Sequence, residues 1–285
     1  MANYEKVELD TGLHLVAVPI GTARDITLRA LDTLASADVL VAEDTRSLRR
    51  LMDIHGVPLG GRRIVAYHDH SDARARERVL AEIAAGHSVA YASEAGTPLV
   101  ADPGYQLVRE AKAAGHHVTG APGPSALIAA LSIAGLPTDS FFFSGFLPNA
   151  KGARQGELRG LAEVPGTLIF YESPKRIGAM LRDAAEALGG AREAAVCREI
   201  TKKFEEVRRG TLSELAEFYA EETPKGEIVV LIDRGTGVQA GEEDISAALS
   251  KALETMSVRD AADAVATAFG LPRRKVYQQA LALGR

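Results

Sequence analysis

Short apolar runs alternate with amphipathic segments along the chain up to about residue 122. The apolar runs are HLVAV, DVLVA, RIVAY, HSVAYA and HHVTGA. Between two of them, DARARERVLAEIAAG places Val79, Leu80, Ile83 and Ala84 on one helical face, and Gly86 follows as an expected C-cap. Strands that alternate with helices in this way predict a largely parallel sheet covered on both faces.

Ligands of such sheets bind beyond the carboxyl ends of the strands. Those ends carry the segments PIG, AEDTR, YHDHSD, ASEAGTP and APGPSA, which are rich in Gly, Pro, Ser and acidic residues. We therefore expect a binding site along this edge of the first sheet.

The pattern changes from about residue 123. Strands are expected at FFFSGFLP, TLIFYES, AAVCREI, EEVRRGT and GEIVVLIDRG, with helices near Pro174–Leu188 and Leu212–Ala220. The strands AAVCREI and EEVRRGT are separated by too few residues for a crossover helix, so they are expected to be antiparallel. A second α/β domain with a mixed sheet follows from this pattern.

The end of the chain is predicted to be helical. GTGVQAGEED has the composition of a linker, and three helical segments follow it: DISAALSKALETM, SVRDAADAVATAFG and PRRKVYQQALAL. The turn GLP between the last two resembles that of a helix-turn-helix. The predicted fold is thus α/β, with a first α/β domain over 1–122, a second over 123–235, and a linker with a small helical domain over 236–285.

Composition narrows the class of protein. Of 285 residues, 46% are apolar and 25% are charged, which is ordinary for a soluble protein. No apolar run approaches the roughly 20 residues of a membrane span, and MANYEKVELDTG lacks the apolar core of a signal peptide. A single cysteine, Cys197, lies in an apolar stretch, so a buried structural thiol is favoured over a nucleophile and a cytoplasmic location is expected.

Net charge gives only a weak indication about nucleic acid. The formal charge of −5 argues mildly against phosphate binding, but Lys202–Arg209 and Pro272–Gln279 are basic islands in an acidic chain. Each island is either a solvated face or a local binding surface, and the sum of charges does not decide between them.

The first loop, VPIGTARDIT, is poorly suited to phosphate. A dinucleotide loop uses several glycines to bring N–H groups against a pyrophosphate, whereas this loop has Gly21 alone. Pro19 has no N–H to donate, and Asp25 adds negative charge. The residues favour a phosphate-free nucleoside ligand such as S-adenosylmethionine, with a structural turn as the alternative.

A set of motifs in one order is far more specific than any of these features alone. VPIGTARDITLRAL, VLVAEDTRSLRRLMDIHGV, YHDHSD, SEAGTPLVADPGYQLV, APGPSALIAALSIAGLP, FSGFLP, TLIFYESPKR, REITKKFEE and KGEIVVLI occur in succession. With these motifs over about 12–235, the chain closely resembles the RsmI family of bacterial small-subunit ribosomal RNA cytidine-2′-O-methyltransferases, which belongs to the tetrapyrrole-methylase-like (class III) methyltransferases. The helical tail resembles that family's C-terminal helix-turn-helix.

The resemblance implies a homodimer with S-adenosylmethionine in the cleft between the two α/β domains. It implies methyl transfer to the ribose 2′-hydroxyl of a cytidine in the decoding centre of 16S ribosomal RNA, within the assembled small subunit and without a membrane. Two alternatives remain. One is a tetrapyrrole methylase of the same fold, although its usual G-x-G-P-G-D loop is absent here; the other is an RNA-binding assembly factor without catalysis.

The resemblance also implies a set of cofactor-binding residues. They are Pro19, Ile20, Gly21, Ser93, Glu94, Ala95, Gly96, Pro122, Gly123, Ser125, Ala126, Tyr171, Glu172, Lys225, Gly226 and Glu227. The alternative is that the Gly and Pro residues only shape turns and that Tyr171 belongs to the core. This chain departs from the family pattern at Thr22–Ala23, where PIGNL is usual, and at Glu94, where SDAGTP is the common form. The longer Glu94 side chain could shift any cofactor contact made through its carboxylate.

The remaining chemistry is expected on charged side chains. A base that accepts the 2′-hydroxyl proton is sought among Glu43, Asp44, Glu199 and Lys202, although Asp44 is equally a helix N-cap and Glu199–Lys202 a surface pair. Contacts with RNA phosphates are expected from Arg46, Arg49, Arg50, Lys202, Lys203, Arg273, Arg274 and Lys275. No metal is expected, since His68, Asp69 and His70 have no obvious further ligands and fit a cleft or an RNA contact better.

Overall fold

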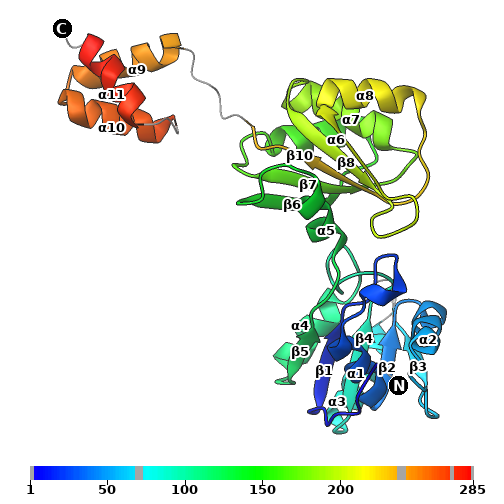
Figure 1. Ribbon diagram of the computed structural model, residues 1–285. Coiled ribbons are helices and arrows are strands. Elements are labelled where there is room, and N and C mark those ends of the chain that lie inside the picture. The colour runs from blue at the N-terminus through cyan, green and yellow to red at the C-terminus, as the bar shows by residue number, and fades with distance from the viewer. Residues whose placement is uncertain (1–2, 68–72, 236–241, 270–272, 284–285) are drawn as a thin grey trace.

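The first half of the molecule is a five-stranded parallel sheet. The computed structural model describes residues 3–67, 73–235, 242–269 and 273–283 (Figure 1). The strands are β1 (Gly12–Val16), β2 (Val39–Ala42), β3 (Ile64–Ala66), β4 (Ser88–Ala92) and β5 (Val118–Ala121), in the order β3-β2-β4-β1-β5. All neighbouring pairs are parallel, which confirms the prediction from the alternating pattern.

Helices cover both faces of this sheet. They are α1 (Leu28–Ser36), α2 (Thr45–Ile54), α3 (Ala73–Ala84) and α4 (Tyr105–Ala113). Side chains of α1 and α2 form one core with the strands, and side chains of α3 and α4 form another on the opposite face. Because both faces are covered, only the strand ends and their loops remain for a site.

The second half contains a mixed sheet. Its strands are β6 (Phe141–Phe146), β7 (Thr167–Glu172), β8 (Glu193–Arg198), β9 (Glu206–Thr211) and β10 (Ile228–Ile232), in the order β6-β7-β10-β8-β9. Strands β6 and β7 are parallel, and β10 is antiparallel to both β7 and β8. The pair β8 and β9 is antiparallel, as the short connection between them predicts.

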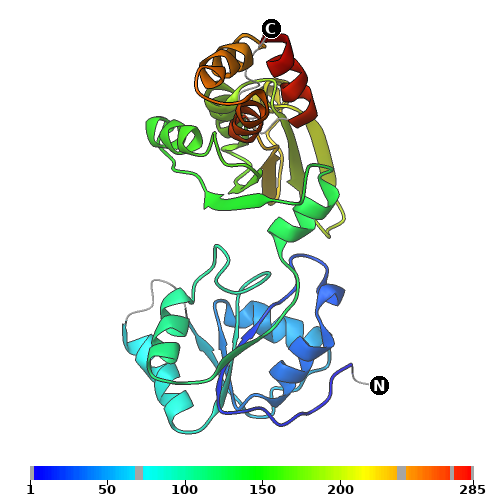
Figure 2. The same cartoon turned by 90° about the vertical axis from the view of Figure 1, so that its left-hand side faces the viewer.

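The two faces of the second sheet are covered differently. Helices α6 (Lys151–Gly160), α7 (Ile177–Leu188) and α8 (Leu212–Glu221) pack on one face. Helix α5 (Ala126–Ile133) packs on the other, together with Ile20 from the first half. In Figures 1 and 2 the two halves are stacked end to end and joined through the segment that leads into α5. The loops at the carboxyl ends of the first sheet therefore face the second half.

Three further helices follow the second sheet. Helices α9 (Glu242–Leu253), α10 (Val258–Ala268) and α11 (Arg273–Leu283) pack on one another around a small core of their own. The expected linker residues 236–241 and the expected GLP turn at 270–272 lie outside the described residues. None of the described helices has the length and apolar character of a membrane span.

Two helices begin only after a short turn, and one of them begins later than expected. The first loop leads into a short 3-10 turn, η1 (Ala23–Asp25), and α1 begins only at Leu28, where Thr27 caps it by accepting a hydrogen bond from the Ala30 amide at 3.2 Å. The helix expected from Pro174 begins at Ile177, because Ser173–Arg176 form a turn first. Gly86 has a φ of +96° directly after α3, which agrees with its expected role as a C-cap.

Candidate functional site

A cavity of about 360 Å³ lies between the two halves. Its first-half walls come from Ile20 and from the loop 95–102, and its second-half walls come from the start of α5 and the ends of β6, β7 and β10. Most of the lining is apolar, with three carboxylates: Asp102, Glu172 and Glu227. A largely apolar cavity with a few polar groups is the usual form of a small-molecule site.

The loop after β4 is held in an uncommon conformation where it meets this cavity. Leu99 and Ala101 have φ values of 72° and 59°, which side chains rarely adopt. Gly96 pairs with Val18 through two backbone hydrogen bonds of 2.9 and 3.0 Å, and Thr97 Oγ1 donates to the Pro124 carbonyl at 2.8 Å. Such conformations persist where surrounding contacts enforce them, and they concentrate at functional sites.

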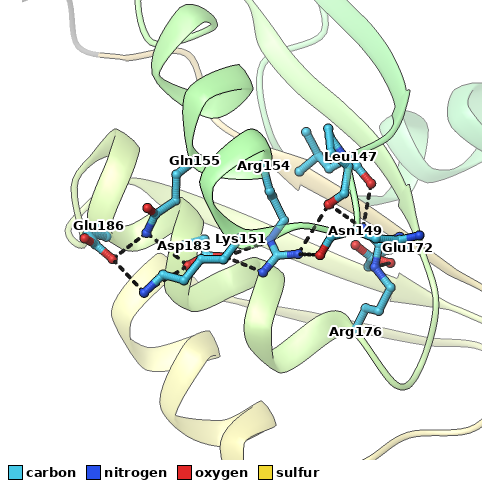
Figure 3. Close-up of polar contacts among 10 residues, drawn as sticks. Leu147, Asn149, Lys151, Arg154, Gln155, Glu172, Arg176, Asp183 and Glu186 are labelled. Atoms are coloured by element: carbon cyan, nitrogen blue, oxygen red, sulfur yellow. Dashed lines mark hydrogen bonds and ion pairs between the residues drawn. The ribbon is translucent and has the colours of Figure 1, made fainter.

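Glu172 brings a buried carboxylate into the cavity wall (Figure 3). Its Oε1 accepts a hydrogen bond from the Ser173 amide at 2.7 Å and lies 3.2 Å from Arg176 Nε, an ion pair without hydrogen-bond geometry. Its Oε2 is buried and has no hydrogen-bond partner. Burial raises the pKa of Glu172, while the Ser173 amide and the charge of Arg176 oppose that shift. A buried acceptor with no partner indicates a missing donor.

Two arginines fix the loop beside Glu172. Arg176 donates to the Leu147 carbonyl at 2.6 Å and to Asn149 Oδ1 at 2.5 Å. Arg154, paired with buried Asp183, donates to the Asn149 carbonyl at 2.9 Å. Figure 3 shows both guanidinium groups directed at this loop from α6 and from the start of α7. The loop follows Phe146, so these contacts also position a cavity-lining side chain.

The two halves are joined by a second set of contacts beside the cavity. The Thr22 amide donates to Thr201 Oγ1 at 3.2 Å, and Thr22 Oγ1 donates to the Thr201 carbonyl. A Cβ at Gly21 would lie 2.6 Å from Lys202 Cγ and 2.7 Å from Thr201 Oγ1. The single glycine of the first loop is therefore required by a close approach between the two halves.

Lys202 is held within the second half. Its Nζ donates to Glu199 at 2.9 Å and to Glu227 at 2.8 Å. Partial burial disfavours its charge, but the bonds to both carboxylates outweigh this and raise its pKa. The hydrogen bond from Lys202 in turn lowers the pKa of Glu199. Both side chains are charged and paired, and their expected surface pair is in fact a three-membered network with Glu227.

The sequence-predicted cofactor residues fall into three groups. Nine of them line the cavity between the halves: Ile20, Ala95, Gly96, Ser125, Ala126, Tyr171, Glu172, Gly226 and Glu227. Four line a separate, smaller cavity: Pro19, Gly21, Ser93 and Glu94. Three line neither cavity: Pro122, Gly123 and Lys225. Of these three, Gly123 serves a close approach, since a Cβ there would lie 2.9 Å from Ala17 Cβ.

The smaller cavity lies on the other side of the same loop. It measures about 170 Å³ and is bounded by the first loop, by Ser93 and Glu94, and by α2. Glu94 thus lines the smaller cavity and not the larger one, and its expected contact with the cofactor stays a prediction.

Sequence reasoning missed several residues of the larger cavity. The most informative is Asp102, which lies in the wall near Tyr171 and contributes to the raised pKa that burial gives that phenol. Asp102 belongs to the motif SEAGTPLVADPGYQLV, so the signal was present in a stretch already recognised. Phe146 and Ile200 had no comparable signal, because apolar wall residues look like core residues in a sequence.

The four candidate bases are not gathered in one cavity. Glu43 and Asp44 follow β2 in the first half, and Glu199 and Lys202 lie in the second. The carboxylate of Asp44 accepts hydrogen bonds from the amides of Arg46 and Ser47 at 2.7 and 3.2 Å, which caps α2 and lowers its pKa. Glu43 Oε2 lies 3.4 Å from the Glu94 amide, next to the loop between the cavities.

The residues predicted to contact RNA differ in whether their charge is already paired within the protein. Lys202 is neutralised by Glu199 and Glu227, and Arg49 pairs with Asp53 at 3.1 Å on the surface of α2. Arg273 pairs with Asp263, and Lys203 lies over the ring of Phe204. Five of the predicted set have no ion pair within the described part of the chain and are exposed: Arg46, Arg50, Lys203, Arg274 and Lys275.

The remaining expectations concern metals and the thiol. Among the described residues no three His, Cys, Asp or Glu side chains gather as metal ligands, and His68, Asp69 and His70 lie outside those residues. Cys197 is buried, and burial raises its pKa to about 12. It is therefore a structural thiol, as its apolar surroundings predict.

Comparison with known proteins agrees with this architecture. The family model for Tetrapyrrole (Corrin/Porphyrin) Methylases matches residues 12–216. Two solved structures share the fold: the methyltransferase CobJ, with a TM-score of 0.61 at 20% identity over 79% of this chain and 95% of that one, and the uroporphyrin-III C-methyltransferase of Thermus thermophilus complexed with S-adenyl homocysteine, with a TM-score of 0.55 at 22% identity over 77% and 96%.

Closer relatives narrow the family. A model for the RsmI C-terminal HTH domain matches residues 239–284. The Ribosomal RNA small subunit methyltransferase I of Mesorhizobium japonicum is 48% identical over 276 residues, covering 96% of this chain and 93% of that protein. With this identity over nearly the whole length, the chain belongs to the ribosomal RNA small subunit methyltransferase I family of the tetrapyrrole methylases.

Proposed function

We propose that this protein is an S-adenosylmethionine-dependent methyltransferase that modifies the 16S ribosomal RNA of the small subunit. The observation that carries the proposal is the cavity between the two halves, with the unpartnered Oε2 of buried Glu172 in its wall. Membership of the ribosomal RNA small subunit methyltransferase I family supplies the reaction class and the kind of substrate.

The residues of this cavity fit S-adenosylmethionine. The ligand combines a flat aromatic base, hydroxyl and amino donors, and a positive sulfonium. Ile20, Val100 and Ile228 offer apolar contact, and Asp102, Glu172 and Glu227 offer acceptors and compensating negative charge. The ligand has no phosphate, in keeping with a first loop whose single glycine serves contact between the halves. When bound, it supplies a methyl group already activated by the sulfonium.

The finer proposal is 2′-O-methylation of a cytidine in the decoding centre, as the motif resemblance implies. The protein's part is to align the 2′-hydroxyl and to accept its proton, and a positioned base adds about 10²–10⁴-fold. Asp44 serves as a cap, while Glu199 and Lys202 are committed to each other. Glu43 is the favoured base because its carboxylate lies beside the loop that separates the two cavities, where it accepts a hydrogen bond from the Glu94 amide.

RNA binding is assigned to two surfaces. Arg46 and Arg50 are exposed on α2 beside the smaller cavity, and Arg274 and Lys275 are exposed on α11. The charges of Arg46, Arg274 and Lys275 would position phosphates rather than select a base. A location in the cytoplasm, with the assembled small subunit as partner, follows from this substrate.

A homodimer is the proposed assembly. Ile128 and Ile133 on α5, with Phe141 and Phe142 on β6, are large apolar side chains that remain exposed on the second half. Pairing of two chains would cover such a surface. Sedimentation at micromolar concentration should give twice the chain mass, and a monomer at all concentrations would contradict this assembly.

The test of the reaction is transfer of labelled methyl groups to three acceptors. They are small subunits lacking the modification, free ribosomal RNA, and a tetrapyrrole mixture. Label in subunits and not in tetrapyrrole is expected. Label only in tetrapyrrole would retain the fold and reject the function, and cofactor binding without any label would favour a non-catalytic assembly factor.

A further inference from the structure

The smaller cavity shares one thin wall with the larger one. The wall is the paired backbone of Val18 and Gly96, and each of the two paired segments contributes residues to both cavities. Ile20 lies in the larger cavity while Pro19 and Gly21 lie in the smaller. A ligand in the smaller cavity is thus a direct neighbour of a ligand in the larger one.

The walls of the smaller cavity suit a flat, neutral ring. Pro19, Leu48, Leu51 and Ile54 supply apolar surface from the first loop and one side of α2. At about 170 Å³ the cavity is under half the size of its neighbour, which is too small for a second whole nucleoside cofactor but suits a single base.

Two side chains of opposite charge complete the lining. Arg50 on α2 and Glu94 on the loop after β4 both border the cavity and are exposed. Within the described residues neither side chain has an ion-pair partner. A carboxylate at this place would repel a phosphate, whereas a guanidinium and a carboxylate together match a ring edge that carries acceptors and a donor.

Cytosine has that edge. Its N4 amino group donates, and its O2 and N3 accept, so a carboxylate recognises N4 while an arginine can donate to an acceptor. Uracil has a carbonyl oxygen in place of the amino group, so a carboxylate facing that position is repelled. Bases that undergo chemistry or specific recognition in RNA are splayed out of their stack and bound along this edge.

We propose that the smaller cavity holds the base of the target nucleotide and that Glu94 selects cytosine over uracil there, with Arg50 as its second contact. The inference rests on the proposed function and deepens it. It also gives Glu94 a role outside the larger cavity. The family motif commonly has Asp at this position, and the side chain of Glu94 extends one carbon further toward the edge of the base.

The first experiment measures methyl transfer to subunits carrying either the target cytidine or a uridine in its place. Glu94→Gln should lower kcat/KM on cytidine by about tenfold and reduce the cytidine-to-uridine preference by a similar factor. Arg50→Met should lower activity on both. Affinity for S-adenosylhomocysteine, measured by calorimetry, should stay within about twofold for each variant.

Matched controls come from α3, on the opposite face of the first sheet. Glu77→Gln and Arg78→Met remove the same charges from exposed side chains that line neither cavity, and neither should change activity or preference. An unchanged cytidine-to-uridine ratio in Glu94→Gln would overturn the proposal. So would a loss of S-adenosylhomocysteine affinity equal to the loss of activity, because Glu94 would then belong to the cofactor site.

A second experiment does not depend on turnover. Methyl-labelled wild-type protein is titrated with cytidine 5′-monophosphate and followed by NMR. The signals of Leu51 and Ile54 should shift, with much weaker shifts for uridine 5′-monophosphate, while Ile228 in the larger cavity should not respond. If the signals of Leu51 and Ile54 do not shift at nucleotide concentrations near the solubility limit, the smaller cavity is rejected as a base-binding site. If wild-type protein transfers no labelled methyl group to small subunits, the proposed function is rejected. The NMR titration would still show whether the smaller cavity binds cytosine.

Discussion

Glu172 at the end of β7 and Arg176, four residues later at the start of α7, form an ion pair, Nε to Oε1 at 3.2 Å, that leaves Oε2 of the buried carboxylate without a hydrogen-bond partner. The same arginine donates to the Leu147 carbonyl and to Asn149. It therefore links the ends of β6 and β7, the strands that bring Phe146, Tyr171 and Glu172 to the cavity. The guanidinium of Arg176 therefore both compensates the negative charge of Glu172 and holds the cavity-lining strand ends in place.

Arg176→Met should destabilise the protein and weaken cofactor binding. It leaves a buried carboxylate uncompensated and removes donors from two loop acceptors, which together cost about 2 kcal/mol. The melting temperature should fall by about 4–8 °C. The double variant Arg176→Met/Glu172→Gln should recover part of that loss, because the unpaired charge is gone. Equal melting temperatures for the single and double variants would contradict this pairing.

Glu172 should also make the thermal stability of the protein depend on pH, with stability decreasing as the pH rises. Burial raises its pKa above the ordinary value of 4.5, so the folded protein holds this proton more tightly than the unfolded chain does. Its contribution is then fully present below the ordinary pKa and is lost as pH rises through the folded pKa. The melting temperature of wild type relative to Glu172→Gln should fall as the pH rises above the ordinary pKa of 4.5. A relative melting temperature that rises over this range would mean the shift has the opposite sign.

Gly21→Ala should test whether the close contact between the two halves determines cofactor affinity. The added Cβ would lie 2.6–2.7 Å from side-chain atoms of Lys202 and Thr201, so these side chains must shift and the contact between the halves is disturbed. We expect S-adenosylhomocysteine affinity to fall by about tenfold, a loss of about 1.4 kcal/mol. Gly152→Ala on α6 is the matched control. Nothing lies within 4 Å of its Cβ, and Ala there should be neutral or slightly stabilising. Calorimetry with unchanged affinity for Gly21→Ala would show that the close approach does not shape the cavity.

Substitutions of the adjacent residues Glu43 and Asp44 should affect activity differently. Asp44→Ser keeps a capping oxygen for the amides of Arg46 and Ser47 and should retain most activity. Glu43→Gln removes a proton acceptor and should lower kcat by about 10²-fold or more with little change in cofactor affinity. If Glu43→Gln turns over within a few-fold of wild type and Asp44→Ser does not, the assignment of the base is reversed.

Removal of residues 241–285 should weaken binding to small subunits while cofactor affinity is kept. Helices α9, α10 and α11 have their own core, and every residue of the larger cavity lies at or before Val229. The exposed charges of Arg274 and Lys275 are lost with the deletion. Filter binding should show at least a tenfold weaker complex, with an unchanged calorimetric constant for S-adenosylhomocysteine. Undiminished subunit binding by the truncated chain would exclude the tail as an RNA contact.

Strand positions and sheet type could be predicted from the sequence because apolar runs and connection lengths carry that information. Helix α5 could not, since ALIAALSI is apolar almost throughout and has no polar face to mark a period. It packs against the second sheet on one side, while Ile128 and Ile133 stay exposed on the other.

The site was predictable as a region but not as a partition into two cavities. Motif order indicated Ser93–Gly96 as a unit, yet Ser93 and Glu94 line one cavity and Ala95 and Gly96 the other. The division depends on the pairing of Gly96 with Val18, a contact between distant segments that local patterns do not encode. The same holds for Arg154 and Asp183, whose buried pair joins two helices.

The most direct test of the central claim is the chemical identity of the labelled product. Small subunits methylated by the wild-type protein are extracted, their RNA is digested to nucleosides, and the label is identified by liquid chromatography and mass spectrometry. One labelled product is expected, 2′-O-methylcytidine, in 16S ribosomal RNA. Label on the ring of a base, or on the ribose of another nucleoside, would contradict it.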